Sequence, residues 1–410
     1  MSGCGCDPSG LRPVDEAIAE LLSLAPSPPP AEWVPLEQAL GRTLAESVHA
    51  PRPIPAWDNS AMDGYALRAA DLPDAGGHLP LAGRIAAGDA ALEALPPGHA
   101  VRIFTGAPLP PGADSVVPQE VARVEGEGVW LPACTSGDHV RRRGEEFEQG
   151  AGVLQAGQRL RAPELGLLAS LGVARVVVYR RLRVGLLSSG NELREPGEPL
   201  HPGQIYDANR YSLTAVLRGW GMEVDDCGVV ADELGASRDA LGLAASRWDV
   251  LISSGGVSVG EEDHLKQAVR ELGELHLWRL AIQPGKPFAF GNVRGTPWMG
   301  LPGNPVAALL TALVVARPFI LAAQGRRVVL PRSVSLPAGF NWLKANGRRQ
   351  YLRARLEPVA GELRAALHAH QGSAMLGAMS WAEGFAVVEA GRTLRAGEPV
   401  EFLALDGLLA

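Results

Sequence analysis

Three glycine-containing loops in the second half of the sequence have the composition of a phosphate-binding site. They are Ser188–Glu192, Ser253–Gly260 and Leu301–Pro305, and each lies next to an apolar run. Glycine lets backbone N–H groups approach an anion closely, and a helix N-terminus adds partial positive charge. Such glycines can also serve packing alone, but three loops together favour a site. We expect these residues to contact a phosphate-bearing ligand: Ser188, Gly190, Ser254, Gly255, Gly256, Ser258, Pro302, Gly303, Asn304 and Pro305.

Acidic residues accompany the same loops. Glu192 closes the first loop, Asp232 follows the next apolar run, and Asp263 follows the second loop. Carboxylates beside a phosphate repel it unless a divalent cation lies between them. Helix capping is the alternative role, above all for Asp263. The cluster favours a Mg²⁺ site formed by Asp232 and Asp263.

A stiff turn, Gln283-Pro284-Gly285-Lys286-Pro287, follows another apolar run. The two prolines limit the directions in which Lys286 can point. Only three of the 38 basic residues are lysines. A lysine at the end of a strand therefore indicates an anion contact rather than a solvated surface charge.

The pentapeptide Gly256–Gly260 also matches the G-x-S-x-G motif of serine hydrolases, with Ser258 as the nucleophile. A hydrolase needs an acid and a histidine as well. The available histidines, His276, His368 and His370, do not lie in distinctive loops, and no HGGG motif occurs. The phosphate-binding interpretation is therefore preferred.

The elements that position these loops are predicted from periodicity. Between Arg183 and Gln324 apolar runs alternate with helical segments, which indicates βαβ units and a parallel, doubly wound sheet. Val14–Leu24 has helical spacing, and Leu36–Val48 is predicted as a second helix that can run into a strand. We expect a helical segment at 11–50 and 139–181, a β-rich insertion at 51–138, an α/β domain at 182–325, and a small β-barrel at 326–410.

Composition excludes several classes of protein. With 410 residues, 46% hydrophobic and 20% charged, the chain has enough apolar material for several folded domains. The net charge of −7 argues against a general nucleic-acid binder, and no apolar run of about 18 residues predicts a membrane span. Four cysteines do not form a disulfide framework, and Cys4 and Cys6 lie in a predicted loose tail. We expect a cytoplasmic protein.

Several longer motifs resemble those of one family. They are DNSAMDGYA, TGAPLPPGADSVVPQE, RRRGEE, SSGNEL, GQIYDANR, ISSGGVSVGEEDH, PGKPFAFG and GLPGNPVAA, in family order between Asp58 and Ala308. The chain resembles the MoeA and gephyrin E-domain family, the molybdopterin molybdenumtransferases. The resemblance implies a Mg²⁺-dependent homodimer that inserts molybdate into adenylylated molybdopterin and releases AMP. It also implies a central domain similar to molybdopterin adenylyltransferase, which is a possible partner together with downstream molybdoenzyme maturation proteins.

The resemblance assigns roles to individual positions. Asp63 matches the MDGY aspartate and Thr105 the TGAP threonine, and Glu192, Asp232 and Asp263 match family acids. Lys286 matches the PGKP lysine, which implies a contact with molybdate or phosphate. Further matches are Pro302 and Pro305 of LPGNP, and Arg353 and Ser373, which resemble positions that hold the oxyanion.

The chain differs from the family pattern at three positions. Glu146 stands where aspartate is usual, and Asn191 stands where aspartate is common. Gln283 replaces the first lysine of the usual K-P-G-K-P, which removes one positive charge from the oxyanion site. We therefore expect weaker oxyanion binding than in relatives with lysine. A non-enzymatic scaffolding role is the alternative, but it would need a further partner-binding region, and the sequence shows none.

Overall fold

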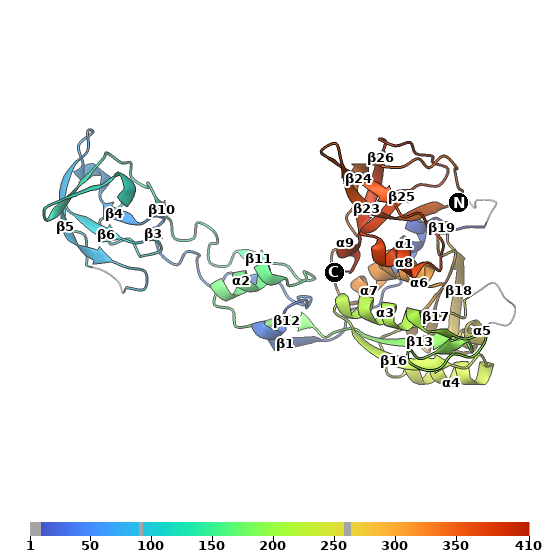
Figure 1. The fold of residues 1–410 in the computed structure, drawn as a ribbon. Coiled ribbons are helices and arrows are strands. Elements are labelled where there is room, and N and C mark those ends of the chain that lie inside the picture. Colours follow the sequence, from blue (N-terminus) through green and yellow to red (C-terminus); the bar gives the residue numbers. More distant parts are fainter. Residues whose placement is uncertain (1–9, 90–92, 258–263, 410) are drawn as a thin grey trace, which may run out of the picture. The chain divides into compact units, whose positions relative to one another are not determined.

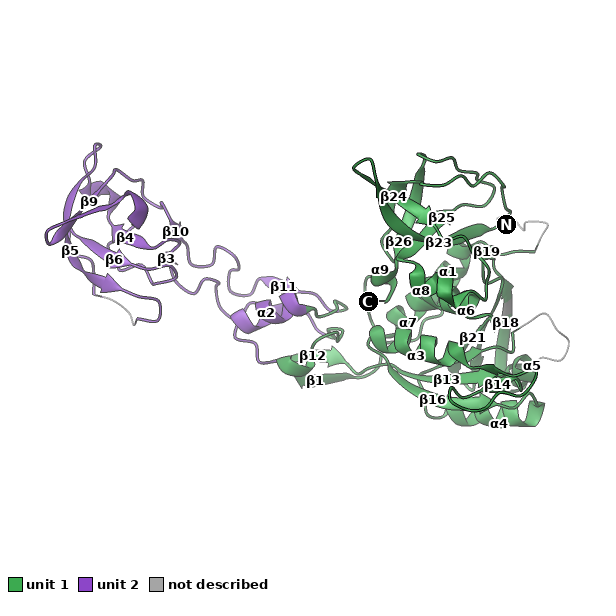
Figure 2. Cartoon of the chain, in the orientation of Figure 1, with its two compact units in different colours: residues 1–45, 157–161, 176–410 green, residues 46–156, 162–175 purple. Residues whose placement is uncertain are grey.

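The structure is a computed structural model that describes residues 10–89, 93–257 and 264–409. Ser258 and Asp263 of the predicted site, and Cys4 and Cys6, lie outside the described residues. The chain divides into two compact units (Figure 2): unit 1 is 1–45, 157–161 and 176–410, and unit 2 is 46–156 and 162–175. The division into four segments stays a prediction.

Unit 1 is built on a six-stranded sheet with the order β16-β13-β17-β21-β20-β18. Its strands are β13 Arg183–Ser189, β16 Glu223–Val230, β17 Val250–Ser254, β18 Gly273–Arg279, β20 Pro287–Val293 and β21 Thr296–Leu301. The strands β16, β13, β17 and β21 are parallel, as predicted. The prediction of a fully parallel sheet is wrong at one edge, where β20 runs antiparallel to both of its neighbours, β21 and β18. The reason is the two-residue turn Arg294-Gly295, in which φ is 51° and 87°, because such a turn joins only antiparallel neighbours.

Helices cover both faces of this sheet, so it is doubly wound (Figure 1). They are α3 Ala208–Gly219, α4 Leu234–Ala245, α5 His264–Leu272, α6 Pro305–Thr311, the π-helical turn η4 Ala312–Ala316 and α7 Arg317–Ala323. Leu186 and Ile252 pack in the core with α3 and α6, while their neighbours Leu187 and Leu251 pack in the core with α4 and α5. This alternation follows from the two-residue period of a strand. The helical stretch Pro305–Ala323 is long and apolar enough to cross a membrane, but 89% of it is buried inside the fold.

The C-terminal part of unit 1 is a small barrel, as predicted. The strands are β19 Ile282–Gln283, β22 Val334–Pro337, β23 Arg349–Val359, β24 Glu362–Leu367, β25 Gly384–Val388 and β26 Pro399–Ala404, with helices α8 Leu376–Trp381 and α9 Leu405–Leu409. The order β23-β25-β26-β22 is closed by β24, which pairs with β23 and meets the end of β22 through the bridge Ala338–Ala365. The short strand β19 adds to β23 in parallel, and this pairing joins the Gln283 turn to the barrel.

The first residues of unit 1 only partly follow the prediction. Helix α1 spans Val14–Ser23, as predicted. The second helix, predicted for Leu36–Val48, is wrong: this stretch forms a 3₁₀ turn, η1 Leu36–Gln38, and the strand β2 Val48–His49. Gly41 follows the turn with φ of 76°, a left-handed conformation that ends a right-handed helix. Strand β1 Ala31–Pro35, which precedes this stretch, pairs with β12 Arg175–Tyr179.

Unit 2 contains the predicted β-rich insertion. Its main sheet has the order β7-β4-β6-β5-β9-β8. Two further two-stranded sheets, β10-β3 and β11-β2, are formed by segments before and after these strands in the sequence. The elements are β3 Asn59–Ser60, β4 Gly64–Leu67, η2 Ala69–Asp71, β5 Gly77–Ile85, β6 Ala100–Ile103, β7 Ser115–Pro118, η3 Gln119–Val121, β8 Arg123–Glu125, β9 Gly128–Leu131, β10 Val140–Arg141, β11 Gly152–Leu154 and α2 Ala162–Ser170.

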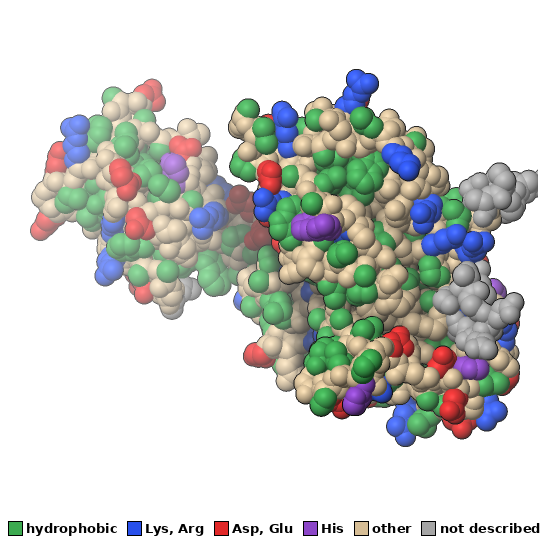
Figure 3. Space-filling model, turned by 45° about the vertical axis from the view of Figure 1, so that its right-hand side comes forward, with side chains coloured by type: hydrophobic (Ala, Val, Ile, Leu, Met, Phe, Trp, Pro, Cys, Tyr) green, Lys and Arg blue, Asp and Glu red, His purple; other side chains and the backbone are tan. Residues whose placement is uncertain are grey.

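Charged side chains of both signs are spread over the face of unit 1 seen in Figure 3, with hydrophobic side chains between them. A mixed surface agrees with the nearly balanced numbers of charged residues, 38 basic and 45 acidic, which give a net charge of −7.

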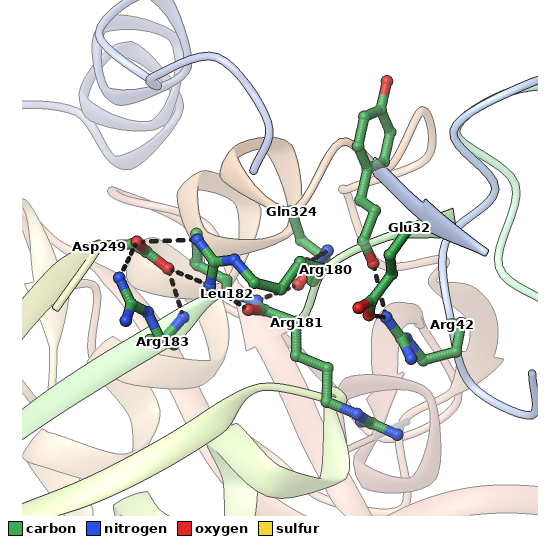
Figure 4. Close-up of polar contacts among 9 residues, drawn as sticks. Glu32, Arg42, Arg180, Arg181, Leu182, Arg183, Asp249 and Gln324 are labelled. Atoms are coloured by element: carbon green, nitrogen blue, oxygen red, sulfur yellow. Dashed lines mark hydrogen bonds and ion pairs between the residues drawn. The ribbon is translucent and has the colours of Figure 1, made fainter. Parts of the chain in front are cut away.

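The segment that leads into β13 is held by two side chains from other parts of unit 1 (Figure 4). Asp249 accepts two hydrogen bonds from the guanidinium of Arg180, at 2.9 and 3.1 Å, and one from the backbone N–H of Arg183, at 2.7 Å. Gln324, at the end of α7, accepts from the backbone N–H of Leu182 at 2.6 Å and donates to the carbonyl of Arg180 at 3.0 Å. These contacts fix the start of β13, and therefore the position of the loop at its other end.

Replacing Asp249 by asparagine is expected to lower the free energy of unfolding of unit 1 by about 1–3 kcal/mol at neutral pH, because the paired charge is lost. Burial alone would raise the pKa of Asp249, but hydrogen bonds from Arg180 and Arg183 outweigh burial and hold this pKa below its usual range. Such a carboxylate stabilises the fold above its unfolded pKa of about 3.9, and the contribution is lost as pH falls through the folded value.

Urea unfolding followed by tryptophan fluorescence checks this expectation at several pH values. The difference between the wild type and the Asp249→Asn variant should be constant near neutrality and shrink below about pH 4. Asp239→Asn is the matched control, because the side chain of Asp239 is 77% exposed and its ion pair is with the adjacent Arg238. A pH-independent difference would contradict the role assigned to the Asp249 charge.

Candidate functional site

A cavity of about 1000 Å³ opens at the carboxyl ends of the parallel strands in unit 1. It is lined by residues of the three glycine-containing loops, which follow β13, β17 and β21, so the prediction that these loops lie together is confirmed. The predicted residues that line it are Gly190, Glu192, Asp232, Ser254, Gly255, Gly256, Lys286, Pro302, Gly303, Asn304, Pro305 and Ser373. Its volume falls in the upper range for ligand pockets.

The three loops touch one another through backbone atoms at Gly255. This residue has a φ of 84°, and its N–H donates to the carbonyl of Leu301 at 3.1 Å. A Cβ at this position would lie 2.5 Å from the carbonyl oxygen of Ser189. Only glycine fits here without a shift of the backbone. The glycine therefore packs the loops together at the same place where it could approach an anion.

Helix α3 adds a residue to the cavity that the sequence analysis did not single out. The side-chain amide of Asn209 donates to the Ser254 hydroxyl and to the carbonyl of Gly303, both at 2.7 Å. Asp207 caps the helix by accepting from the backbone N–H of Arg210 at 3.1 Å. Asn209 thus ties the second loop to the third. The signal available was the GQIYDANR motif, which contains both residues.

Three carboxylates line the cavity among the described residues. Glu192 and Asp232 were predicted, and Asp207 was not. The side-chain carbonyl of Asn191 accepts from the backbone N–H of Asp232 at 3.3 Å, which joins the loops after β13 and β16. Asn191 therefore links the two loops that carry Glu192 and Asp232. The aspartate that is common at this position in the family has a side-chain oxygen that could accept the same hydrogen bond.

The cationic side chains of the cavity come from other elements. Lys286 lies in the turn after β19, and Arg348 directly precedes β23. Of the residues that line the cavity and that the structure describes, these two carry the positive charge. Arg348 was not among the predicted site residues.

Two predicted residues of unit 1 lie beneath the cavity wall rather than in it. Ser188 is fully buried, and its neighbour Ser189 lines the cavity instead. Arg353 is also fully buried and donates to the carbonyls of His370 and Gly372, at 3.1 and 3.2 Å. Burial lowers the pKa of Arg353, because it penalises the charged form.

Arg353 therefore supports the loop that presents Ser373. The carbonyl of Ser373 accepts from the backbone N–H of Val306 at 2.9 Å, at the start of α6. The loop is thus held from the barrel by Arg353 and from the central domain by α6. The direct oxyanion contact predicted for Arg353 stays a prediction, while its contacts in the structure are with backbone carbonyls.

Asp63 and Thr105 lie together in unit 2. Asp63 accepts hydrogen bonds from the backbone N–H and from the hydroxyl of Thr105, both at 2.8 Å. These hydrogen bonds lower the pKa of Asp63. The resemblance assigns the two residues to separate motifs, and the structure shows them in direct contact. Their catalytic role stays a prediction.

The residues of the cavity fit a Mg²⁺ ion that is shared with a substrate. Among the described residues there is no group of three or more His, Cys, Asp or Glu that could hold a metal by itself. Mg²⁺ usually keeps several waters and is bound by one or two carboxylates together with substrate phosphates. Glu192 and Asp232 supply such carboxylates at the loops suited to phosphate.

Comparisons with known proteins cover nearly the whole chain. Residues 12–172 match the MoeA N-terminal region (domain I and II), residues 185–322 a probable molybdopterin binding domain, and residues 335–405 the MoeA C-terminal region (domain IV). The molybdopterin molybdenumtransferase of Haemophilus influenzae is 39% identical over 401 residues, which are 97% of this chain and 99% of that protein. The chain belongs to the MoeA family.

Other MoeA relatives agree. Molybdopterin molybdenumtransferase 2 of Mycobacterium tuberculosis is 40% identical over 347 residues, covering 80% of this chain and 84% of that protein. Crystal structures of MoeA proteins from Pyrococcus horikoshii give TM-scores of 0.82 at 26% identity and 0.75 at 31% identity, each covering 96% of this chain. Membership of the MoeA family gives no support to the serine-hydrolase or scaffolding alternatives.

The predicted site residues fall in all three MoeA regions, and the cavity of unit 1 is formed by two of them. The probable molybdopterin binding domain supplies the three loops, the acids and Lys286. The MoeA C-terminal region supplies Arg348 and Ser373. The MoeA N-terminal region carries Asp63 and Thr105.

Proposed function

We propose that this chain is a molybdopterin molybdenumtransferase that inserts molybdenum, supplied as molybdate, during molybdenum cofactor biosynthesis. The observation that carries the proposal is its match to MoeA proteins along nearly its full length. The cavity supports it, because glycine-rich loops, carboxylates and two cations line one space of about 1000 Å³. The finer proposal is that the substrate is adenylylated molybdopterin and that AMP is released with Mg²⁺ present.

The residues of the cavity suit different parts of such a substrate. The backbone N–H groups around Gly255 and the start of α6 suit the phosphates. Glu192 and Asp232, with Asp263 by resemblance, would hold Mg²⁺, which supplies charge neutralisation and orientation of the pyrophosphate when bound. Lys286 suits the incoming oxyanion, because a charge-assisted hydrogen bond to a dianion is stronger than a neutral one.

The cellular setting follows from the same family. We propose a homodimer in the cytoplasm, supplied by a reaction that adenylylates molybdopterin and followed by proteins that mature molybdoenzymes. Among the described residues, the cysteines Cys134 and Cys227 are both free thiols, which suits a reducing compartment.

Incubation with adenylylated molybdopterin, Mg²⁺ and molybdate tests the proposed function. We expect stoichiometric release of AMP together with molybdenum bound to the pterin, and we expect neither product without Mg²⁺. Product analysis by chromatography and by elemental analysis for molybdenum gives both readouts. AMP release without molybdenum insertion at any molybdate concentration would contradict the proposal.

Replacing Lys286 by alanine is expected to raise the molybdate concentration for half-maximal insertion by about tenfold, because one charge-assisted hydrogen bond to the dianion is lost. Affinity for adenylylated molybdopterin should stay close to the wild-type value. Separate titrations of the two substrates measure the effects. Lys344→Ala is the matched control, since Lys344 is exposed and does not line the cavity. A loss of pterin-nucleotide affinity alone would place Lys286 on the substrate phosphates instead.

A further inference from the structure

The side chain of Gln283 is the meeting point of three donors from the barrel. Its amide oxygen accepts from the side-chain amide of Asn346 at 2.7 Å, from Nη2 of Arg348 at 3.3 Å and from the amide of Gln350 at 3.4 Å. The contacts follow from the parallel pairing of β19 with β23, in which Gln283 lies opposite Gln350. Position 283 therefore carries a hydrogen-bond acceptor.

Arg348 is placed in the cavity by these contacts. Besides the bond to Gln283, the side-chain oxygen of Asn346 accepts from the backbone N–H of Arg348 at 3.1 Å. No carboxylate of the residues that the structure describes forms an ion pair with Arg348. A guanidinium has five N–H donors in a planar fork. The hydrogen bond to Gln283 occupies one of them, and the side chain lines the cavity, so donors remain for a ligand.

A lysine at position 283 could not make these contacts. An ammonium group has three donors and no acceptor. It could not accept from Asn346, Arg348 and Gln350 as the present oxygen does, and it would add a second positive charge at the wall that carries Arg348. In this chain the positive charge at this wall of the cavity therefore resides on Arg348, which donates to the neutral acceptor at position 283.

We propose that Arg348, oriented by Gln283, is the second cation of the oxyanion site and acts together with Lys286. The inference rests on the proposed function, since it names the residues that bind molybdate. Molybdate is a tetrahedral dianion, and the fork of a guanidinium can bind two oxygens of such an anion at once, which an ammonium cannot do. On this proposal Arg348 supplies positive charge beside Gln283, so the loss of the first family lysine is offset, in contrast to the weaker binding expected from the sequence.

Direct binding of molybdate, measured by isothermal titration calorimetry on the full chain, tests the pair. Arg348→Ala is expected to raise the dissociation constant of molybdate by about tenfold or more, with unchanged affinity for adenylylated molybdopterin. Lys344→Ala, which removes the same charge four residues earlier on an exposed position, should bind molybdate as the wild type does.

Gln283→Lys alone should also weaken molybdate binding. The new ammonium removes the acceptor that orients Arg348, and it repels the guanidinium. The exchanged pair, Gln283→Lys with Arg348→Gln, restores one cation and one acceptor and should recover most of the affinity. Recovery in the double variant excludes loss of folding as the cause. Gln283→Glu should weaken molybdate binding as well, because the carboxylate keeps the acceptor but neutralises the guanidinium.

The outcomes separate this inference from the proposed function. Tighter molybdate binding by Gln283→Lys, or unchanged binding by Arg348→Ala, overturns the inference even where the wild type inserts molybdenum. Molybdate binding that depends on Arg348, in a chain that releases no AMP and inserts no molybdenum, upholds the oxyanion site and contradicts the proposed function. A wild type that binds no molybdate overturns both.

Discussion

Replacing Asp232 by asparagine is expected to reduce AMP release from adenylylated molybdopterin by about 100-fold or more, because a charge next to the reacting phosphates is removed. Asparagine keeps the size of the side chain and the backbone N–H that donates to Asn191 at 3.3 Å, so the loop can keep its position. The carboxylate lines the cavity and is exposed to it. Its loss leaves Glu192 as the remaining predicted acid among the described residues of the two loops.

The Mg²⁺ titration tells a metal-binding role from a structural one. If Asp232 helps to hold the ion, the Asp232→Asn variant should require a higher Mg²⁺ concentration for half-maximal AMP release, and excess Mg²⁺ should restore part of the rate. Asp225→Asn is the matched control, since Asp225 is an exposed acid on β16, the strand that precedes Asp232, and does not line the cavity. An unchanged Mg²⁺ requirement in the Asp232→Asn variant would remove Asp232 from the metal site.

The elements of the central domain could be predicted because their signals are local. Helix α5 spans His264–Leu272 and α6 begins at Pro305, both within the stretch where the sequence predicts apolar runs alternating with helices. The three loops lie at one cavity because the carboxyl ends of parallel strands meet at one edge of a sheet. That rule needs only the order of strands and helices along the chain.

The contribution of the barrel to the site could not be predicted in this way. Arg348 reaches the cavity next to the pairing of β19 with β23, and its hydrogen bond to Gln283 joins residues 65 positions apart in the sequence. A two-residue strand such as Ile282–Gln283 has no periodicity from which to predict a partner. Without knowledge of that pairing, the sequence shows only that Gln283 replaces a lysine of the family motif, and it therefore predicts a weaker oxyanion site.

Burial was the second property that the sequence could not supply. Arg353 and Ser188 were assigned to the ligand because of their types and motifs, yet both are fully buried and neither lines the cavity. An arginine that resembles a binding residue can also support a loop through backbone carbonyls, as Arg353 does with Gly372 at 3.2 Å. The motif identifies the region of the site, and the fold decides which side chain faces the ligand.

Replacing Gly255 by alanine is expected to weaken binding of adenylylated molybdopterin by about 100-fold or more, since a displacement of about 1 Å in a site can have an effect of this size. The new Cβ would lie 2.5 Å from the carbonyl oxygen of Ser189, so the ends of β13 and β17 would have to separate. Gly303→Ala adds a methyl group in the same cavity without a close protein contact, because its Cβ would lie 3.8 Å from the nearest atom, the Cα of Gly255. Any loss of affinity in that variant therefore reports contact with the ligand rather than separation of the loops. Fluorescence or calorimetric titration with the pterin nucleotide measures both.

The cost of a left-handed backbone must be separated from the cost of the contact with Ser189. Gly228 provides the comparison: it has a φ of 83°, close to the 84° of Gly255, but a Cβ added there would have no atom within 4 Å, and the residue does not line the cavity. Gly228→Ala should therefore lower the free energy of unfolding by about 1–2 kcal/mol through backbone strain, with normal ligand binding. Gly255→Ala should show this strain and lose ligand affinity as well. If the two variants bind the pterin nucleotide equally well, close packing of the loops at Gly255 is not what shapes the phosphate site.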